Sequence, residues 1–86
     1  MDIKIRRVKR VLAEKFPDAE TELSIYPGET KVGGYLIWKG FTNFDQLDRQ
    51  RMVAKALRES LGDDYRSKVT TIFTVTPVEI MAMRED

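Results

Sequence analysis

The chain has 86 residues, enough for one domain with a single core, and 42% of its residues are hydrophobic while 34% are charged. It contains no histidine and no cysteine, which excludes the usual general base at neutral pH, thiol nucleophiles, soft metal ligands and disulfides. The net charge is only +1, so the whole chain is not a strongly basic or acidic protein. We expect one domain over residues 1–86 in a reducing compartment such as the cytoplasm, with no membrane span and no secretory signal.

Residues 2–16 are predicted to form an amphipathic helix that ends before Pro17. Apolar side chains recur at Ile5, Val8 and Leu12, which are helical spacings, and cations occupy the other side. Residues 1–16 hold six cations and two carboxylates, a net +4, so the other seventy residues carry −3. This basic end is interpreted either as a footprint for an anionic partner or as the solvated face of the helix.

Two strands are predicted next, paired as an antiparallel hairpin. Residues 20–26 alternate between apolar and polar side chains, as in a half-buried strand. Residues 27–28 are typical of a turn, and residues 29–32 read as a polar connection closed by Gly33-Gly34. Residues 35–41 are rich in aromatic and branched side chains and are predicted to form the second strand.

A long helix is predicted to follow, with Thr42 or Asn43 as its N-cap and Gly62 as its C-cap. Its apolar stripe consists of Met52, Val53, Ala56, Leu57 and Leu61.

The remaining elements are a surface turn over residues 63–66, a strand over residues 69–75 and a short last helix. Thr76-Pro77-Val78-Glu79 has the pattern of a helix start: a threonine N-cap, a proline in the first turn and a reciprocating glutamate. We expect Val78, Ile80, Met81 and Met83 to be available for packing from this helix.

The order of these elements predicts an α/β (α+β) two-layer sandwich. A strand–helix–strand crossover requires a parallel pair, so the sheet is expected to be three-stranded and mixed, with the helices on one face. The other face is expected to be partly open. Tyr35 or Trp38 on that face is either solvent-facing filler or a contact surface for a partner.

Catalysis is not expected. The carboxylate pairs Glu20/Glu22 and Asp63/Asp64 fall on a strand exterior and in a turn, where nothing shifts their pKa values apart. The glycines match no phosphate-binding loop, and the serines have no histidine to activate them.

Nucleic-acid binding is the more favoured chemistry. Cations on the first helix and around the long helix are suited to phosphates, in a salt-dependent and sequence-independent way. Tyr35, Trp38 and Phe41 are either base-stacking or packing aromatics. The candidate nucleic-acid-binding residues are Arg6, Arg7, Lys9, Arg10, Arg49, Arg51 and Lys68.

The chain resembles the BolA family over nearly its whole length. The resemblance rests on the stretch from Phe41 to Val53, which includes Arg49 and Arg51, on Leu57 and Leu61, and on Thr76-Pro77-Val78-Glu79. It implies a class II KH-like topology and binding of nucleic acid or protein partners.

The family also shares an iron–sulfur cluster with a monothiol glutaredoxin through histidine. The resemblance implies that this ligand is the family's third-strand histidine, which falls near Lys68 here, and that the hairpin loop, here residues 27–34, supplies a second ligand in some members; this loop has neither histidine nor cysteine, and the family's histidine between its two arginines is Gln50. We therefore expect no cofactor and no cluster sharing.

Two functions remain open at this stage. One is a non-enzymatic BolA-like domain that binds nucleic acid through the cations given above. The alternative is a protein–protein adaptor or homodimer in which an open sheet edge, or Tyr35 and Trp38, makes the contact. One arginine of the Arg49/Arg51 pair is then explained by pairing with Asp45 or Asp48, since residues two positions apart do not share a helix face.

Overall fold

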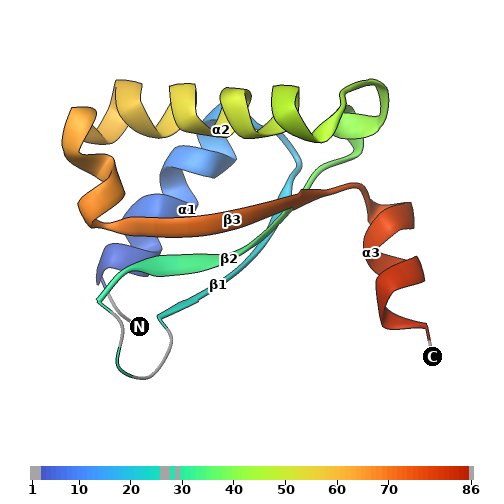
Figure 1. Ribbon diagram of the computed structural model, residues 1–86, viewed down its shortest axis with the longest axis horizontal. Coiled ribbons are helices and arrows are strands. Elements are labelled where there is room, and N and C mark those ends of the chain that lie inside the picture. Colours follow the sequence, from blue (N-terminus) through green and yellow to red (C-terminus); the bar gives the residue numbers. More distant parts are fainter. Residues whose placement is uncertain (1–2, 26–27, 29, 86) are drawn as a thin grey trace.

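The computed structural model describes residues 3–25, 28 and 30–85, which form three α-helices, two short 3₁₀ helices and one three-stranded sheet (Figure 1). The elements are α1 (Ile3–Lys15), β1 (Glu20–Ile25), β2 (Val32–Ile37), η1 (Lys39–Asn43), α2 (Gln46–Leu61), η2 (Asp63–Ser67), β3 (Val69–Val75) and α3 (Pro77–Arg84). The predicted α+β architecture and the order of helices and strands are confirmed.

The sheet has the strand order β1-β2-β3, with β1 antiparallel to β2 and β2 parallel to β3. Both the predicted hairpin and the predicted mixed sheet are therefore confirmed. The β2–β3 register contains a bulge between Val32 and Gly34, after which Leu36 pairs with Thr74 and Ile37 with Val75. Because neighbouring residues in a strand point to opposite faces, Leu36 and Ile37 belong to different sides of the sheet.

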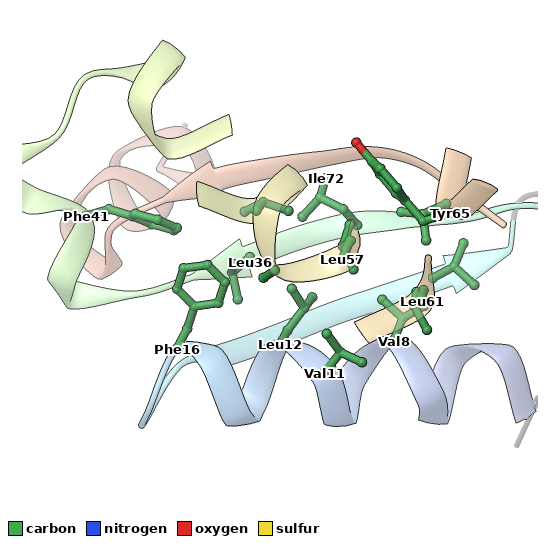
Figure 2. Packing of buried hydrophobic residues seen from close by; sticks show 14 residues of the cluster. Val8, Val11, Leu12, Phe16, Leu36, Phe41, Leu57, Leu61, Tyr65 and Ile72 are labelled. Carbon is green, nitrogen blue, oxygen red and sulfur yellow. The ribbon is translucent and has the colours of Figure 1, made fainter. Parts of the chain in front are cut away.

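The main core lies between the sheet and the two long helices. Val8 and Leu12 of α1 and Phe16, directly after this helix, point toward the sheet, and Leu57 and Leu61 enter from α2 (Figure 2). The helical spacing of these apolar residues is the reason why both helices lie on the same face of the sheet. Packing of this kind is the main source of stability in a small chain without disulfides.

The short helix α3 departs from the expected placement of the helices on one face. Its Ile80 packs with Ile37 and Val75, the side chains that point away from α1 and α2. The capping box predicted at Thr76 and Glu79 is present. Val78, Met81 and Met83 are exposed, so the expectation that they pack was wrong; Ile80 is the residue of this short helix that is buried.

The second strand begins and ends earlier than predicted. Gly33 and Gly34 lie inside β2 and do not close a turn, and residues 39–41, predicted as the end of the strand, belong to η1. The aromatic side chains that suggested a strand pack locally: the Trp38 ring contacts Phe16 at 5.2 Å and Phe41 at 5.1 Å between centroids. The Trp38 indole N–H also donates to the Pro17 carbonyl at 2.9 Å, and this bond fixes the chain where β2 ends.

The predicted surface turn at residues 63–66 is the 3₁₀ helix η2, and it is not wholly a surface element. Tyr65 is buried, and its ring joins the main core. Burial of an aromatic ring removes a large apolar area from water, and this favours the inward position of Tyr65 and of the segment that carries it.

The N-cap of α2 is Asp45, and not Thr42 or Asn43 as predicted. The Asp45 carboxylate accepts the Asp48 backbone N–H at 2.8 Å, while the Thr42 hydroxyl donates to the Lys39 carbonyl at 2.6 Å inside η1. Asp45→Ala is therefore expected to lower the free energy of unfolding by about 1 kcal/mol. Asn43→Ala should change it by only a few tenths, and urea denaturation of both variants compares the two positions; equal losses would contradict Asp45 as the cap.

Candidate functional site

The cations of α1 form one exposed, basic surface. We call Arg6, Arg7, Lys9 and Arg10 the basic face; all four side chains are exposed. They lie opposite the buried Val8 and Leu12, because a helix that packs its apolar stripe must turn the rest of its circumference to solvent. Five ion pairs occur among the described residues, and none involves these four cations. The basic face therefore presents positive charge that the described part of the protein does not neutralise.

Lys68 lies beside this face although it is sixty residues away in the sequence. It immediately precedes β3, and together with Arg7 and Lys4 it lines a pocket between α1 and the end of α2. The structure thus brings together two of the predicted binding residues, Arg7 and Lys68, from opposite halves of the chain.

Arg49 is not available to a nucleic acid, contrary to the prediction. Only 4% of the residue is exposed, and its guanidinium donates to the carbonyls of Phe44 at 2.8 Å and Thr74 at 3.2 Å. The same group forms a bidentate pair with Glu79, at 2.7 and 3.2 Å to the two carboxylate oxygens. A buried guanidinium needs all these acceptors, so Arg49 joins α2, β3 and α3 and has a structural role.

Arg51 points the other way and remains exposed. Its guanidinium lies 3.9 Å from the Asp48 carboxylate. The sequence analysis expected such a pairing with Asp45 or Asp48 for one of the two arginines. Such an exposed pair is weak, so Arg51 remains accessible to a ligand.

The Arg49–Glu79 pair gives stability a pH dependence. Hydrogen bonds from Arg49 and from the Thr76 backbone hold the pKa of Glu79 below its usual value of 4.5. A carboxyl group whose pKa is lower in the folded than in the unfolded state stabilises at neutral pH, and this contribution is lost as the pH falls through its titration. We expect Glu79→Gln to be less stable than the native chain at pH 7 and the difference to shrink below pH 4.5, as measured by urea denaturation. A difference that stays constant down to pH 3 would contradict this origin.

The open sheet face carries an aromatic pair. Tyr35 and Phe73 lie 5.3 Å apart between ring centroids, and they are register partners on β2 and β3. Phe73 is 49% exposed, whereas the Arg84 guanidinium lies 5.9 Å from the Tyr35 ring and forms an ion pair with Glu22. Sequence reasoning missed Phe73, and the alternation of β3 alone does not tell which of its sides is open.

Trp38 does not share this face with Tyr35. It is half-buried against Phe16 and Phe41, and its N–H is bonded to Pro17. Phe41 itself is fully buried. Of the three aromatics considered for stacking, Tyr35 alone lies on the open face, and its neighbour there is Phe73.

The residues at the family's histidine positions do not fit an iron–sulfur cluster. Gln50 uses its amide N–H₂ to bond the Ile72 carbonyl at 2.9 Å and the Thr74 hydroxyl at 3.2 Å. Lys68 carries an ammonium, which has no free pair of electrons for a metal at neutral pH. The sequence contains no histidine or cysteine elsewhere, and the described residues hold no group of three or more acids that suits a metal ion.

These features define a small α+β domain with an αββαβα order, a cation-rich helix and an aromatic pair on an open sheet. Its fold is that of BolA proteins. The structure is similar to BolA1 from Arabidopsis thaliana, with a TM-score of 0.73 and 24% identity over 92% of this chain and 98% of that one.

Other solved structures agree. The BolA domain of SufE1 from Arabidopsis thaliana gives a TM-score of 0.71 at 15% identity, covering 92% of this chain and 98% of that chain. A BolA-like hypothetical protein from Rickettsia prowazekii gives 0.67 at 19% identity, covering 88% and 97%. Neither family models nor curated protein sequences give a match. The resemblance predicted from the sequence is thus confirmed as a likeness of fold.

Proposed function

We propose that this chain is a non-enzymatic binding domain of BolA type that binds nucleic acid through the basic face of α1. The observation that carries the proposal is that Arg6, Arg7, Lys9 and Arg10 are all exposed and take no part in the ion pairs of the described residues. Phosphates of a nucleic-acid backbone are the ligands that such unpaired cations attract.

Binding of this kind depends on the charge of the nucleic-acid backbone more than on its base sequence. A helix face of four cations is attracted to backbone phosphates whatever the base sequence, and these contacts position the strand. Arg51 and Lys68 add charge beyond α1, whereas Arg49 stays inside the fold. We place the protein in the cytoplasm, because a chain without cysteine has no disulfide that reducing conditions would break. No helix in the described ranges is long and apolar enough to cross a bilayer.

The proposal predicts a steep dependence of affinity on salt. Four phosphate contacts imply that a single strand binds about 50-fold, and a duplex about 150-fold, more weakly at 200 mM than at 50 mM salt. Fluorescence anisotropy with labelled single- and double-stranded oligonucleotides measures both values. Replacing Arg6 and Arg10 together with glutamine should lower the affinity and flatten the salt slope by about one unit per cation removed.

The matched control is Arg58→Gln on α2, because Arg58 already faces Asp63 at 3.9 Å. It removes one positive charge, half of what the double variant removes, from a position that is already paired, so its salt slope should match that of the native chain. Absence of binding at 50 mM salt, or an equal loss in both variants, would overturn the basic face as the binding surface.

The second candidate function is protein binding through the open sheet face. It is favoured by the exposed Phe73 beside Tyr35 and by the exposed Met81 and Met83 of the neighbouring α3. One of the similar structures is a BolA domain within SufE1, so this fold does occur as part of a larger protein. Binding or self-association at this face should be nearly independent of salt and should weaken with Phe73→Ser, as measured by sedimentation.

A further inference from the structure

The two outer strands of the sheet, β1 and β3, differ in how their free edges are covered (Figure 1). The edge of β3 is closed by side chains of α2: the Gln50 amide donates to the Ile72 carbonyl at 2.9 Å, and the Gln46 amide donates to the Thr74 carbonyl at 3.0 Å. Arg49 donates to the same Thr74 carbonyl at 3.2 Å. A strand from another molecule would therefore find these β3 carbonyls already occupied.

The register of the sheet shows which backbone groups of β1 point outward. The Trp38 N–H donates to a carbonyl of β3 at 2.9 Å, and because backbone groups alternate in direction along a strand, Tyr35 directs its own N–H and C=O to β1. Glu22 is the register partner of Tyr35, so its backbone groups point to β2, and those of its neighbours point away from the sheet. The outward residues of β1 are Thr21, Leu23 and Ile25.

No side chain in the described part of the chain closes this edge of β1. None of them forms a hydrogen bond with the backbone of the three outward residues. The strand also contains no proline and no lysine, the residues with which proteins often protect an edge strand. The N–H and C=O groups of the outward residues are thus available to a further strand.

A groove of about 430 Å³ lies beside this edge, between α1 and β1. Lys9 and Ala13 line it from the helix, and residues 19–22 line it from the strand and the turn before it. Ala13 and Ala19 have small side chains, so the groove leaves room for the side chains of an added strand.

The charges along the edge indicate which strand would fit. Successive side chains of an added strand point alternately to the helix side and to the open side of the sheet. On the helix side they pass Lys9, and on the open side they pass Glu20 and Glu22. Lys9 and Glu20 form no ion pair among the described residues, whereas Glu22 is bound by Arg84. A strand with acidic residues on its helix side and basic residues on its open side complements both charges.

A second copy of this chain does not meet this requirement. Its β1 has the sequence Glu-Thr-Glu-Leu-Ser-Ile, which offers no basic residue to Glu20. Pairing of two copies through β1 about a two-fold axis also places both α1 helices on the same side of the joined sheet. The Lys9 flank of each helix then faces the other copy, and the like charges repel.

We propose that the free edge of β1 binds an extended segment of a partner protein as a fourth strand of the sheet, with acidic residues toward α1 and basic residues toward the open face. Main-chain hydrogen bonds to Thr21, Leu23 and Ile25 hold the segment, and Lys9 and Glu20 select it by charge. This inference goes beyond nucleic-acid binding, and it holds whether or not the basic face binds a nucleic acid.

The test uses the ¹⁵N-labelled full chain and two capped octapeptides. The first is Thr-Glu-Lys-Val-Lys-Glu-Thr-Val, which as a strand places both glutamates on one side and both lysines on the other. In the second peptide, the second lysine and the glutamate that follows it are exchanged. Composition and net charge are then the same, but each side of the strand has one charge of each sign.

We expect the first peptide to cause saturable amide shifts along β1. At a free peptide concentration of about ten times Kd, hydrogen exchange of the Thr21, Leu23 and Ile25 amides should slow about tenfold. The amides of Glu22 and Ser24 point to β2, so their exchange should change much less. The second peptide should bind about fivefold more weakly, because one charge on each side has the wrong sign.

Charge reversal at Lys9 tests the selection. Lys9→Glu should bind the first peptide about fivefold more weakly and lose the preference for it over the second. Arg10→Glu is the matched control, because it makes the same change of charge on the same helix but does not line the groove. It should change the affinity for either peptide by less than about twofold at physiological salt.

Several results would overturn the proposal. Protection of the outward amides in the free chain that rises with protein concentration would assign the edge to a second copy. Saturable binding without protection of Thr21 and Leu23 would place the peptide elsewhere on the protein. Equal affinities for the two peptides, or equal losses in Lys9→Glu and Arg10→Glu, would contradict selection by charge. Absence of saturable binding of either peptide would show that the edge does not accept such a strand.

Discussion

Gly34→Ala is expected to lower the free energy of unfolding by about 4 kcal/mol, although it adds only one methyl group. A Cβ at this position would lie 1.9 Å from the backbone carbonyl oxygen of Glu22 on the adjacent strand. The backbone also has φ of +139°, which L-residues with side chains rarely adopt. Overpacking costs about 1–3 kcal/mol and the strained backbone about 1–3 kcal/mol, and the two add because neither is relieved without separating β1 from β2.

That loss is a large part of the total stability, which for 86 residues is about 4–13 kcal/mol. Urea denaturation followed by circular dichroism measures it, and Gly28→Ala is the matched control. Gly28 also has a positive φ, +82°, but a Cβ there meets nothing within 4 Å in the described part of the chain, so about 1 kcal/mol of backbone strain is the expected cost. Equal losses in the two variants would show that the close approach of β1 to Gly34 has no energetic consequence.

Arg49→Met is expected to destabilise the protein by about 3 kcal/mol, with a fall in Tm of about 12–24 °C. Methionine keeps an apolar chain of similar length but donates no hydrogen bond. The Phe44 carbonyl then loses the 2.8 Å bond from Arg49, and the Glu79 carboxylate loses both of its bonds to the guanidinium. These acceptors are partly shielded from water, so leaving them without a donor is costly, and they lie where α2, β3 and α3 meet.

Arg51→Met is the matched control, because Arg51 is two residues away on the same helix but its side chain is 70% exposed. An exposed ion pair at 3.9 Å contributes little, so this variant should lose less than about 0.5 kcal/mol. Arg49→Lys keeps the charge but not the bidentate geometry and should fall between the two. If Arg49→Met unfolded at the same urea concentration as Arg51→Met, the structural role assigned to Arg49 would be wrong.

Arg49, Thr76 and Glu79, three of the residues that carried the resemblance, therefore form one structural unit. Arg49 contacts Glu79, and the carboxylate of Glu79 in turn accepts the backbone N–H of Thr76 at 2.8 Å. Their joint presence is explained by the junction of three elements, and it does not by itself indicate a binding function. Arg51, in the same short stretch, is exposed and remains available to a partner.

Local patterns were enough to predict most of the fold. The apolar spacing of α1, the proline after Phe16 and the capping box at Thr76 and Glu79 each act within one or two turns of the chain. The mixed sheet followed as well, because a strand–helix–strand crossover leaves only a parallel pair. The exposed cations of the basic face also follow from the sequence, since a helix with one apolar stripe has only one solvated side.

The tertiary structure decided which side chains are free to bind. Nothing near Arg49 in the sequence shows that its guanidinium pairs with the carboxylate of Glu79, thirty residues later. Likewise, nothing near Gly34 shows that the Glu22 carbonyl leaves no room for a side chain there. The pairing of Tyr35 with Phe73 depends on the register of two strands separated by the whole of α2. The meeting of Arg7 with Lys68 likewise depends on how α1 docks against the end of α2. Contacts of this kind arise from packing between distant segments, whereas sequence patterns report only the conformation and the polarity of each segment by itself.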